Sequence, residues 1–362
     1  MGGRVVVAMS GGVDSGVAAL LLARQGYDVI GVSAALLGTD ESTGECCSLA
    51  MAEEARRVCR KIGVPHFMMN LKEMFAESVI KEYLRAYQSG MTPNPCVTCN
   101  KLVKFDRIVK YAKTMDADLV ATGHYANIEE ADGALVLKKG VDPRKDQSYF
   151  LYILRQEVMR HLIFPLGGLT KDEVRIIARD AELPNANKAE SQDICFVTGE
   201  DPMKSLLAKH MNAAPTPGPI CDPTGKVIGQ HKGIEYYTIG QREGLGVAAG
   251  ERVYVYRIDP STNTIYVARQ THHPILSFRA GDINIVTPSI FSDGGKYNVK
   301  SRYHQKPMRG TVHKVGVGDN GESLDVTLEE AHYFITPGQS LVIYDGAAVI
   351  GGGTIERGMD IP

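Results

Sequence analysis

The chain has 362 residues, a hydrophobic content of 44% and a formal net charge of −2. At about 150 residues per domain, this length predicts two or three domains. No apolar run approaches the roughly 20 residues of a membrane span, and the first residues lack the basic start and small-residue exit of a signal peptide. We therefore expect a cytoplasmic globular protein without a membrane partner, in which any contact with RNA is local.

Cysteine usage favours a reducing compartment. The chain holds seven cysteines, an odd number, which suits reduced thiols or thiol chemistry better than a framework of structural disulfides. Four of them lie outside the motifs discussed below: Cys46, Cys47, Cys59 and Cys221. For most of these four we expect buried, inert thiols.

Short apolar strands alternate with helical stretches from residue 4 to about residue 125. The expected elements are strands over 5–9, 27–33 and 64–69 and from 119, with helices ending at 24 and over 48–62, 74–88 and 105–115. This alternation predicts an α/β domain with a doubly wound, Rossmann-like parallel sheet and helices on both faces. Ligands of such sheets bind beyond the carboxyl ends of the strands, where Ser10 and Gly123-His124 fall.

The stretch Ser10-Gly11-Gly12-Val13-Asp14-Ser15 connects the first strand to the first helix. This order places unpaired backbone N–H groups and the positive end of a helix dipole at one point, which favours an anion such as phosphate. The two glycines let the backbone bend and approach the anion, and the two serine hydroxyls add donors. The alternative is a turn that only joins the strand to the helix.

The same loop lacks the lysine of a Walker A motif, because no lysine lies between Arg4 and Lys61. A loop that holds pyrophosphate without that lysine suits chemistry at the α-phosphate, with an AMP ester as product. It resembles the PP-loop of the N-type ATP pyrophosphatases, which adenylate carbonyl oxygens. Asp14 is expected to position magnesium or the turn, or to cap the helix. His124 is expected to stabilise charge on the phosphate or to cap the strand end.

The second half of the chain changes character. Thr170-Lys171-Asp172-Glu173 reads as a capping box that opens a helix to about residue 181, and residues 213–219 read as a linker. Short β-branched and aromatic segments follow, bounded by turn residues. We expect a catalytic domain over 1–205, a central β-rich domain over 206–272 and a barrel-like domain over 273–362.

One window, residues 297–315, carries basic residues without Asp or Glu. Its cations are Lys300, Arg302, Lys306, Arg309 and Lys314, and they lie beside aromatic residues. This window predicts a local RNA contact, and the alternative is a solvated strand face.

Two cysteine segments carry the remaining chemistry. The two prolines predict that residues 92–101 form a loop, which a helix follows. The helix dipole together with Lys101 would lower the pKa of Cys99 and make it a thiolate. Cys195 stands where a polar segment becomes apolar. Two thiols on one active face could pass sulfur, one carrying it as a persulfide and the other opening a disulfide afterwards.

Other interpretations of Cys96-x-x-Cys99 stay open. Structural zinc normally needs a second cysteine or histidine pair, which is absent nearby. Cys96, Cys99 and Cys195 together could instead hold an iron–sulfur cluster through three thiolates, with one iron open to sulfide.

Blocks of this sequence resemble the family of bacterial tRNA-specific 2-thiouridylases, in the order of that family over almost the whole chain. The blocks are residues 10–15, 92–100, 121–125, 145–150, 191–196, 240–246 and 336–340. The resemblance implies that Cys99 is the nucleophile and Cys195 the persulfide carrier, with a disulfide between them during turnover. It implies ATP contacts at Ala8, Met9, Ser10, Gly11, Gly12, Val13, Asp14, Ser15, Ala34 and Gly123.

The resemblance also implies a set of tRNA contacts. These are Asn94, Pro95 and Cys96 facing the target base, together with His124, Lys145, Asp146, Gln147, Arg302, Tyr303 and Gln339. Cys96 stands where many members carry Asp, which weakens an acid role at this position and favours a metal-ligand role. Ala34 stands where members often have Met.

The implied activity is ATP-dependent 2-thiolation of the wobble uridine of tRNA. ATP adenylates O2 of the uracil, a sulfur nucleophile attacks C2, AMP departs, and the target base is turned out of the anticodon stack. The implied cofactors are ATP and Mg²⁺, and the partners are tRNA and a persulfide-donating sulfur carrier protein or cysteine desulfurase. Two other classes compete: an amide-forming PP-loop ligase that uses ammonia on a small carbonyl substrate, and a non-catalytic RNA-binding protein.

Overall fold

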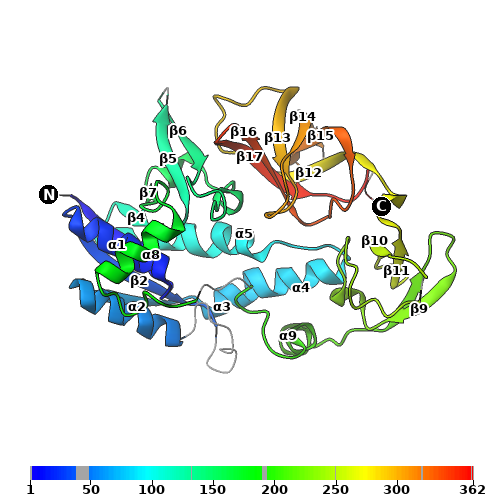
Figure 1. Ribbon diagram of the computed structural model, residues 1–362, viewed down its shortest axis with the longest axis horizontal. Helices are drawn as coiled ribbons and strands as arrows, with labels where there is room; N and C mark the ends of the chain where they lie inside the picture. The colour runs from blue at the N-terminus through cyan, green and yellow to red at the C-terminus, as the bar shows by residue number, and fades with distance from the viewer. Residues whose placement is uncertain are drawn as a thin grey trace.

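The computed structural model describes residues 2–37, 49–131, 133–189, 194–248, 250–318, 321–359 and 361. Cys46, Cys47 and residues 191–193 of the second cysteine segment lie outside these ranges. An α/β domain occupies one end of the molecule, and two β units occupy the other (Figure 1). Within the described ranges, no helix is long and apolar enough to cross a membrane.

A five-stranded parallel sheet forms the centre of the α/β domain, with the order β3-β2-β1-β4-β7. Its strands are β1 (Arg4–Ala8), β2 (Asp28–Ala35), β3 (His66–Asn70), β4 (Leu119–Ala121) and β7 (Leu162–Ile163). Val5, Val6 and Val7 of the central strand are fully buried, because both faces of the sheet are covered. The predicted doubly wound parallel sheet is confirmed.

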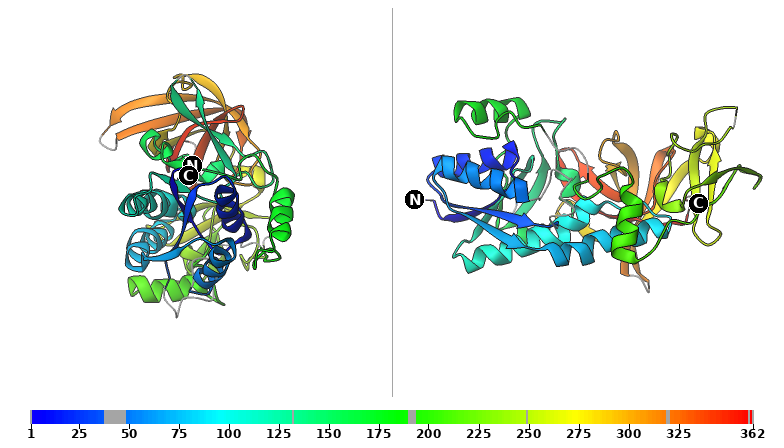
Figure 2. Two further views of the ribbon diagram at one scale, coloured as in Figure 1. Left: turned by 90° about the vertical axis from the view of Figure 1, so that its left-hand side faces the viewer. Right: turned by 90° about the horizontal axis from the view of Figure 1, so that it is seen from below.

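Helices cover both faces of this sheet (Figure 2). On one face pack α1 (Val13–Arg24), α2 (Leu49–Ile62) and α8 (Lys171–Asp180), and on the other packs α6 (Asp106–Thr114). The remaining helices are α3 (Lys72–Phe75), η1 (Ala76–Ile80), α4 (Lys81–Gln88), η3 (Ser148–Phe150), α7 (Gln156–Met159) and α9 (Pro202–Met211). The expected capping box of α8 is present, with reciprocal bonds between Thr170 and Glu173.

The helix that carries the first cysteine pair begins earlier than the sequence predicts. It starts at Pro95 and runs through α5 (Pro95–Cys99) and the π-helical η2 (Asn100–Phe105) into α6. Asn94 caps this helix by accepting a hydrogen bond from the N–H of Val97, and proline at the first helical position needs no N–H partner. The predicted start at residue 105 is therefore wrong.

The rest of the chain is β structure with two short 3₁₀ turns, η4 (Ile234–Tyr236) and η5 (Gln270–His272). A central sheet has the order β10-β11-β8-β9. Its strands are β8 (Gly218–Cys221), β9 (Val227–His231), β10 (Tyr254–Asp259) and β11 (Thr264–Ala268).

The last six strands form a closed barrel, because β12 pairs with both β15 and β17. They are β12 (Ile275–Ile285), β13 (Gly295–Lys300), β14 (Met308–Gly318), β15 (Gly321–His332), β16 (Ser340–Asp345) and β17 (Ala348–Ile355). This confirms the predicted barrel-like C-terminal unit. A hairpin from the first half of the chain, β5 (Ala126–Ala131) and β6 (Ala134–Lys139), extends the same sheet through the pairing of Lys138 with Ala348.

The α/β domain and the barrel also share a hydrophobic core. Val6 and Val120 of the parallel sheet belong to one buried cluster with Tyr149, Val342 and Tyr344. The barrel is therefore packed against the α/β domain, which brings distant parts of the sequence to one site.

We expect the barrel core to tolerate truncation poorly. Phe278 is completely buried, whereas Leu276 on the same strand β12 is 48% exposed. Phe278→Ala should lower the free energy of unfolding by about 3–5 kcal/mol, because it removes buried area and leaves a cavity. Leu276→Ala should cost less than about 1 kcal/mol. Urea denaturation of both variants checks this, and equal losses would contradict the assigned strand orientation.

Candidate functional site

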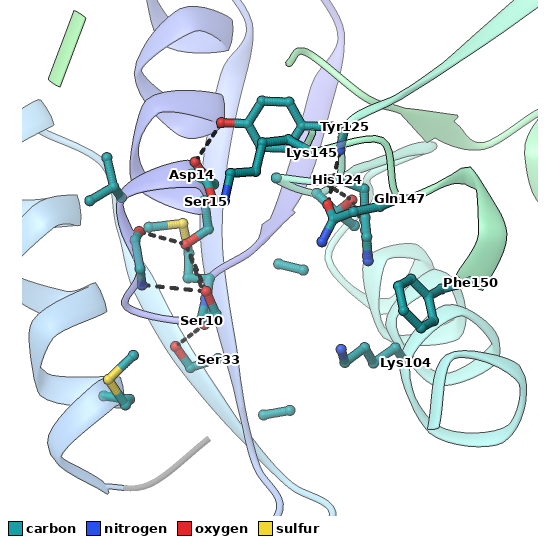
Figure 3. A pocket seen from close by; sticks show the side chains of 18 of the residues that line it. Ser10, Asp14, Ser15, Ser33, Lys104, His124, Tyr125, Lys145, Gln147 and Phe150 are labelled. Carbon is teal, nitrogen blue, oxygen red and sulfur yellow. Dashed lines mark hydrogen bonds between the residues drawn. The ribbon is translucent and has the colours of Figure 1, made fainter. Parts of the chain in front are cut away.

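A cavity of about 530 Å³ opens at the carboxyl ends of β1, β2 and β4. Figure 3 shows Ser10, Asp14 and Ser15 on one side of it and Lys104, Gln147 and Phe150 on the other. Most of the residues predicted to contact the nucleotide line this cavity: Ala8, Met9, Ser10, Gly12, Val13, Asp14, Ser15, Ala34 and Gly123. Gly11 does not line it and lies behind the loop against Met51.

Two glycines allow the loop to take its path. Gly11 has φ +75°, and a Cβ atom there would lie 2.3 Å from the backbone oxygen of Met51. A Cβ atom on Gly123 would lie 2.8 Å from the backbone of Asp14 and Ser15. Any side chain at either position would push the loop away from β4 or α2.

The serine hydroxyls stabilise the turn itself. Ser15 Oγ donates to the carbonyl oxygen of Gly12 at 3.1 Å and accepts from the N–H of Ser10 at 3.2 Å. Gly12 is the N-cap residue of α1 and has no side chain to occupy the helix terminus. The first N–H groups of α1 therefore face the cavity as donors for an anion.

Basic residues outnumber carboxylates on the described cavity wall. Five of the described lining residues are basic: Lys104, Arg144, Lys145, Lys171 and Lys188. Asp14 is the one carboxylate among the described residues of this wall. A cavity with this charge distribution and a helix N-terminus suits a polyanion such as a triphosphate.

Asp14 is held by a buried ion pair. Lys171 Nζ lies 2.6 and 2.8 Å from its two carboxylate oxygens, and the hydroxyl of Tyr125 donates to the carboxylate at 2.8 Å. Only 6% of the Lys171 side chain is exposed. Lys171 is the first residue of α8, where the helix dipole disfavours a cation, so the pairing with Asp14 offsets an unfavourable position.

This arrangement decides between the expected roles of Asp14. The carboxylate is not a helix cap, because Gly12 is the N-cap. It is also neutralised by Lys171, and no group of three or more potential ligands for a metal ion exists among the described residues. The carboxylate of Asp14 is therefore engaged by Lys171 and Tyr125, which favours a role in fixing the turn.

His124 is a neutral residue of the cavity wall. Its Nδ1 lies 2.6 Å from Thr122 Oγ1, and its ring packs against Phe105 and Phe164. Burial, together with the charge of Lys104, holds the pKa of His124 well below its ordinary value. Burial therefore favours the neutral imidazole, which could act at a phosphate only as a hydrogen-bond donor, and the expected role of His124 at the phosphate stays a prediction.

The residues predicted to contact tRNA fall into two groups. Lys145, Gln147, His124 and Tyr303 line the cavity. Asp146 instead stabilises its own loop, because its carboxylate accepts hydrogen bonds from the N–H of Gly140 and from the N–H and hydroxyl of Ser148. Asn94, Pro95, Cys96, Arg302 and Gln339 lie outside the cavity lining.

An aromatic wall stands at one edge of the cavity. The ring centroids of Phe150 and Tyr303 are 4.6 Å apart, and those of Tyr303 and His304 are 4.5 Å apart. All three residues line the cavity. Aromatic faces of this kind stack single-stranded bases.

The basic window of residues 297–315 is not one continuous patch. The ammonium group of Lys300 donates to the carbonyl oxygen of Tyr303, and burial lowers its pKa. Arg302 also points inward. Lys314 pairs with Glu322 at 2.7 Å. Lys306 and Arg309 are exposed, so the window offers fewer surface cations than the sequence predicts.

The structure brings Cys99 and Cys195 to one apolar cluster. Cys99 is 6% exposed and belongs to the cluster, and the half-buried Cys195 packs against it. Phe196 anchors the Cys195 segment, because its ring lies 5.6 Å from that of Phe75 and 5.1 Å from that of Tyr83.

This cysteine cluster borders the cavity. Leu36, just after β2, belongs to the cluster and also lines the cavity, and Ala34 contacts both. Neither cysteine is itself a lining residue. The cluster that holds the two thiols therefore adjoins the anion site through Leu36 and Ala34.

Two expectations about the cysteines need correction. Lys101 does not lie free beside Cys99, because both carboxylate oxygens of Asp282 bind its ammonium group at 2.8 Å. Cys96 is exposed whereas Cys99 is buried, and with Cys195 they form no metal-ligand group in the described part of the chain. The three residues do not fit an iron–sulfur cluster or a zinc site in this arrangement.

Sequence reasoning missed two residues of the loop's support. Lys171 reads only as part of a capping box, although a lysine at the first position of a helix was a usable signal. Asn185 is 3% exposed, and its Nδ2 donates to the carbonyl oxygen of Gly11 at 3.2 Å. Its segment carries no motif that would reveal this contact.

The parallel sheet with its glycine loop places the chain in the HUP class of α/β proteins. Three family profiles match in order: a tRNA methyl transferase HUP domain over residues 3–199, a tRNA methyl transferase PRC-barrel domain over 204–269 and an aminomethyltransferase β-barrel domain over 276–355. Proteins named tRNA-specific 2-thiouridylase MnmA, from several bacteria, match over nearly the whole chain.

The protein of that name from Clostridioides difficile (strain 630) is 44% identical over 364 residues, which cover 99% of each chain. That of Clostridium acetobutylicum is 41% identical and covers 98% of this chain and 100% of the relative. That of Carboxydothermus hydrogenoformans is 41% identical and covers 98% of each. The chain belongs to the tRNA-specific 2-thiouridylase family.

Breaking the Asp14–Lys171 pair should destabilise the fold. We expect Lys171→Met to lower the free energy of unfolding by about 2 kcal/mol, which is below the range for fully buried pairs because the Asp14 side chain is 33% exposed. Adding Asp14→Asn should recover part of this loss, since no uncompensated carboxylate remains. A double-mutant cycle by urea denaturation measures the coupling, and strictly additive losses would show that the two residues act independently.

His124 should make stability depend on pH. Its pKa is lowered in the folded state from an ordinary value of 6.5, so the unfolded state binds the additional proton below pH 6.5, and stability falls as the pH drops through that value. At pH 5.5 this contribution amounts to about 1.4 kcal/mol.

The check is the free energy of unfolding at pH 7.5 and pH 5.5 for the wild type and His124→Gln. The variant should lose about 1.4 kcal/mol less on acidification. The other buried histidines are common to both proteins, so their contributions cancel in this comparison. An identical pH dependence of the two proteins would mean that His124 is protonated in the folded state.

Proposed function

We propose that this protein catalyses the ATP-dependent 2-thiolation of the wobble uridine of tRNA. The observation that carries the proposal is that two sites adjoin each other at Leu36. One is a cation-lined cavity at a glycine loop, and the other is an apolar cluster that holds Cys99 and Cys195. Membership of the tRNA-specific 2-thiouridylase family supports the same substrate and reaction.

The first step is activation of the uracil. The N–H groups at the start of α1 and the lysines of the cavity wall bind the phosphates of ATP. O2 of the uracil attacks the α-phosphorus, and the bond to pyrophosphate breaks. N3 gives up its proton in this step, which leaves a neutral adenylate on O2.

The aromatic wall supports the substrate half of the site. Phe150, Tyr303 and His304 offer ring faces at the cavity edge, and Lys145 adds a cation for a neighbouring phosphate. A loop nucleotide of tRNA can turn outward at a modest cost, so the target base reaches the cavity and stacks on these rings.

The second step transfers sulfur. A donor of persulfide sulfur, either a carrier protein or a cysteine desulfurase, loads Cys195. The terminal sulfur of this persulfide attacks C2, and AMP leaves. Cys99 then attacks Sγ of Cys195, which breaks the bond to the transferred sulfur and forms a Cys99–Cys195 disulfide.

The electrons and protons balance in this sequence. The transferred sulfur is reduced from the sulfane to the thiocarbonyl level, and the two cysteines are oxidised to a disulfide. N3 regains its proton as the thiocarbonyl forms. An external thiol reduces the disulfide before the next turnover.

The test is thiolation of tRNA by the purified protein with ATP and a persulfide donor, followed by mass spectrometry of wobble nucleosides. We expect Cys99→Ser and Cys195→Ser to lower the rate at least about 10³-fold, because each removes a sulfur that forms or breaks a bond. ATP binding should stay within about twofold, since neither thiol lines the cavity. Cys221→Ser, in the central sheet, is the matched control and should keep full activity.

The same assay separates the competing reactions. Cys96→Ser should keep thiolation within a few-fold, because Cys96 is exposed and has no part in the transfer. Loss of activity in Cys96→Ser, with iron in the wild-type protein, would replace the persulfide route by a cluster. Full activity of both the Cys99 and Cys195 variants, or ammonia-dependent release of pyrophosphate without tRNA, would favour an amide-forming ligase instead.

A further inference from the structure

The segment that leads into the cysteine helix is held by all three parts of the molecule. Residues 89–94 connect α4 to α5, and Asn94 caps α5. Barrel residues hold both halves of this segment. Arg357 donates to the carbonyl oxygens of Ser89 and Gly90 at 3.3 and 3.2 Å. The start of the segment is therefore tied to the residues that follow β17.

Gln339 holds the two residues that come just before the helix cap. Its side-chain Nε2 donates to the carbonyl oxygen of Thr92 at 2.9 Å and to that of Pro93 at 3.3 Å. The N–H of Thr92 in turn donates to the carbonyl oxygen of Pro337 at 2.8 Å. Three hydrogen bonds thus join one turn of the barrel to two consecutive residues immediately before the helix cap.

The turn that carries Gln339 lies very close to the backbone of Thr92. Gly338 has φ +87°, and a Cβ atom there would lie 3.0 Å from the carbonyl oxygen of Thr92. The turn is also anchored in the barrel, since the N–H of Ile355 donates to the carbonyl oxygen of Gln339 and the N–H of Gly338 donates to that of Ile355. Glycine is therefore required where the barrel meets the loop.

Residues just after η4 join the same junction. Thr92 Oγ1 donates to Thr238 Oγ1 at 3.3 Å. The guanidinium of Arg302 donates to the carbonyl oxygen of Ile239 at 2.7 Å and to Thr336 Oγ1 at 2.5 Å. The half-buried Arg302 thereby connects the residues after η4 to the Gln339 turn, and desolvation lowers its pKa.

Thr92 and Pro93 are separated from Cys99 only by the helix cap and the short helix α5. Pro93 is followed by the cap Asn94, the helix starts at Pro95, and Cys99 is the last residue of α5. Because the helix is capped at Asn94 and Cys99 is buried, a displacement of Thr92 and Pro93 moves the start of the helix and the thiol together.

We propose that Gln339 is a positioning residue for Cys99, which acts by holding Thr92 and Pro93. This inference rests on the proposed function for its effect on thiolation. Nε2 donates to two of the protein's own carbonyl groups, so the side chain is engaged before any RNA binds.

The experiment compares Gln339→Ala and Gln339→Met with the control Gln230→Ala, an exposed glutamine on β9. The methionine variant keeps the length of the side chain and removes the donor. We expect both Gln339 variants to lower the single-turnover thiolation rate about tenfold at saturating tRNA and ATP, because small displacements of a reacting group are costly. The dissociation constant for tRNA should change by less than about twofold.

A second readout works without tRNA or ATP. Iodoacetamide labelling of reduced protein, followed by mass spectrometry of the cysteine peptides, measures the accessibility of each thiol. Loosening of the segment should raise the labelling rate of the buried Cys99 at least about threefold. Cys221, buried in the central sheet, should keep its slow rate and thereby exclude global unfolding.

The outcomes are distinct. Weaker tRNA binding with an unchanged rate at saturation and unchanged Cys99 labelling would overturn the inference and make Gln339 an RNA contact. Equal acceleration of Cys99 and Cys221 would overturn it as well, because the effect would then be global. If the wild-type protein does not thiolate tRNA, the proposed function fails, while Cys99 labelling still decides the role of Gln339.

Discussion

The ion pair between Asp14 and Lys171 is the interaction on which the anion site depends. It joins two segments that are 157 positions apart in the chain, and it neutralises the carboxylate that would otherwise repel a phosphate from the glycine loop. Asp142, which is almost completely buried, accepts the backbone N–H of Lys171 and so ties the start of α8 to the loop after β6. The positive wall of the cavity is therefore assembled by tertiary contacts and not by the loop itself.

The fold gives the anion site and the two cysteines different surroundings. The described wall of the cavity carries five basic residues and one carboxylate, whereas Cys99 and Cys195 lie in an apolar cluster that shares Leu36 with this wall. Apolar surroundings raise the pKa of a thiol, as burial does for Cys59. The activation and sulfur-transfer steps of the proposed reaction therefore belong to chemically different surroundings.

The sequence predicts those parts of the structure that depend on local pattern. Val5-Val6-Val7 followed by Ser10-Gly11-Gly12 predicts a buried strand and an anion-binding turn, because both depend on neighbouring residues. The sequence alone does not predict the contact of Lys171 with Asp14 or that of Gln339 with Thr92. Gln339 and Thr92 are 247 positions apart, and the periodicity of hydrophobic residues reports only on contacts between near neighbours in the chain. The sequence does contain a signal for the early start of the cysteine helix. Asn94 is a favourable N-cap residue, and proline is common at the first position of a helix, where Pro95 stands, although it breaks a helix at interior positions.

The pairing of β6 with β17 has a consequence for synthesis on the ribosome. A hairpin that is translated early finds its sheet neighbour in the barrel, Ala348, only after the residues between them have been made. The shared core likewise includes Val342 and Tyr344, so the α/β domain emerges with an apolar surface that stays uncovered until the barrel strands follow. Such long-range closure slows folding and leaves a nascent chain open to aggregation.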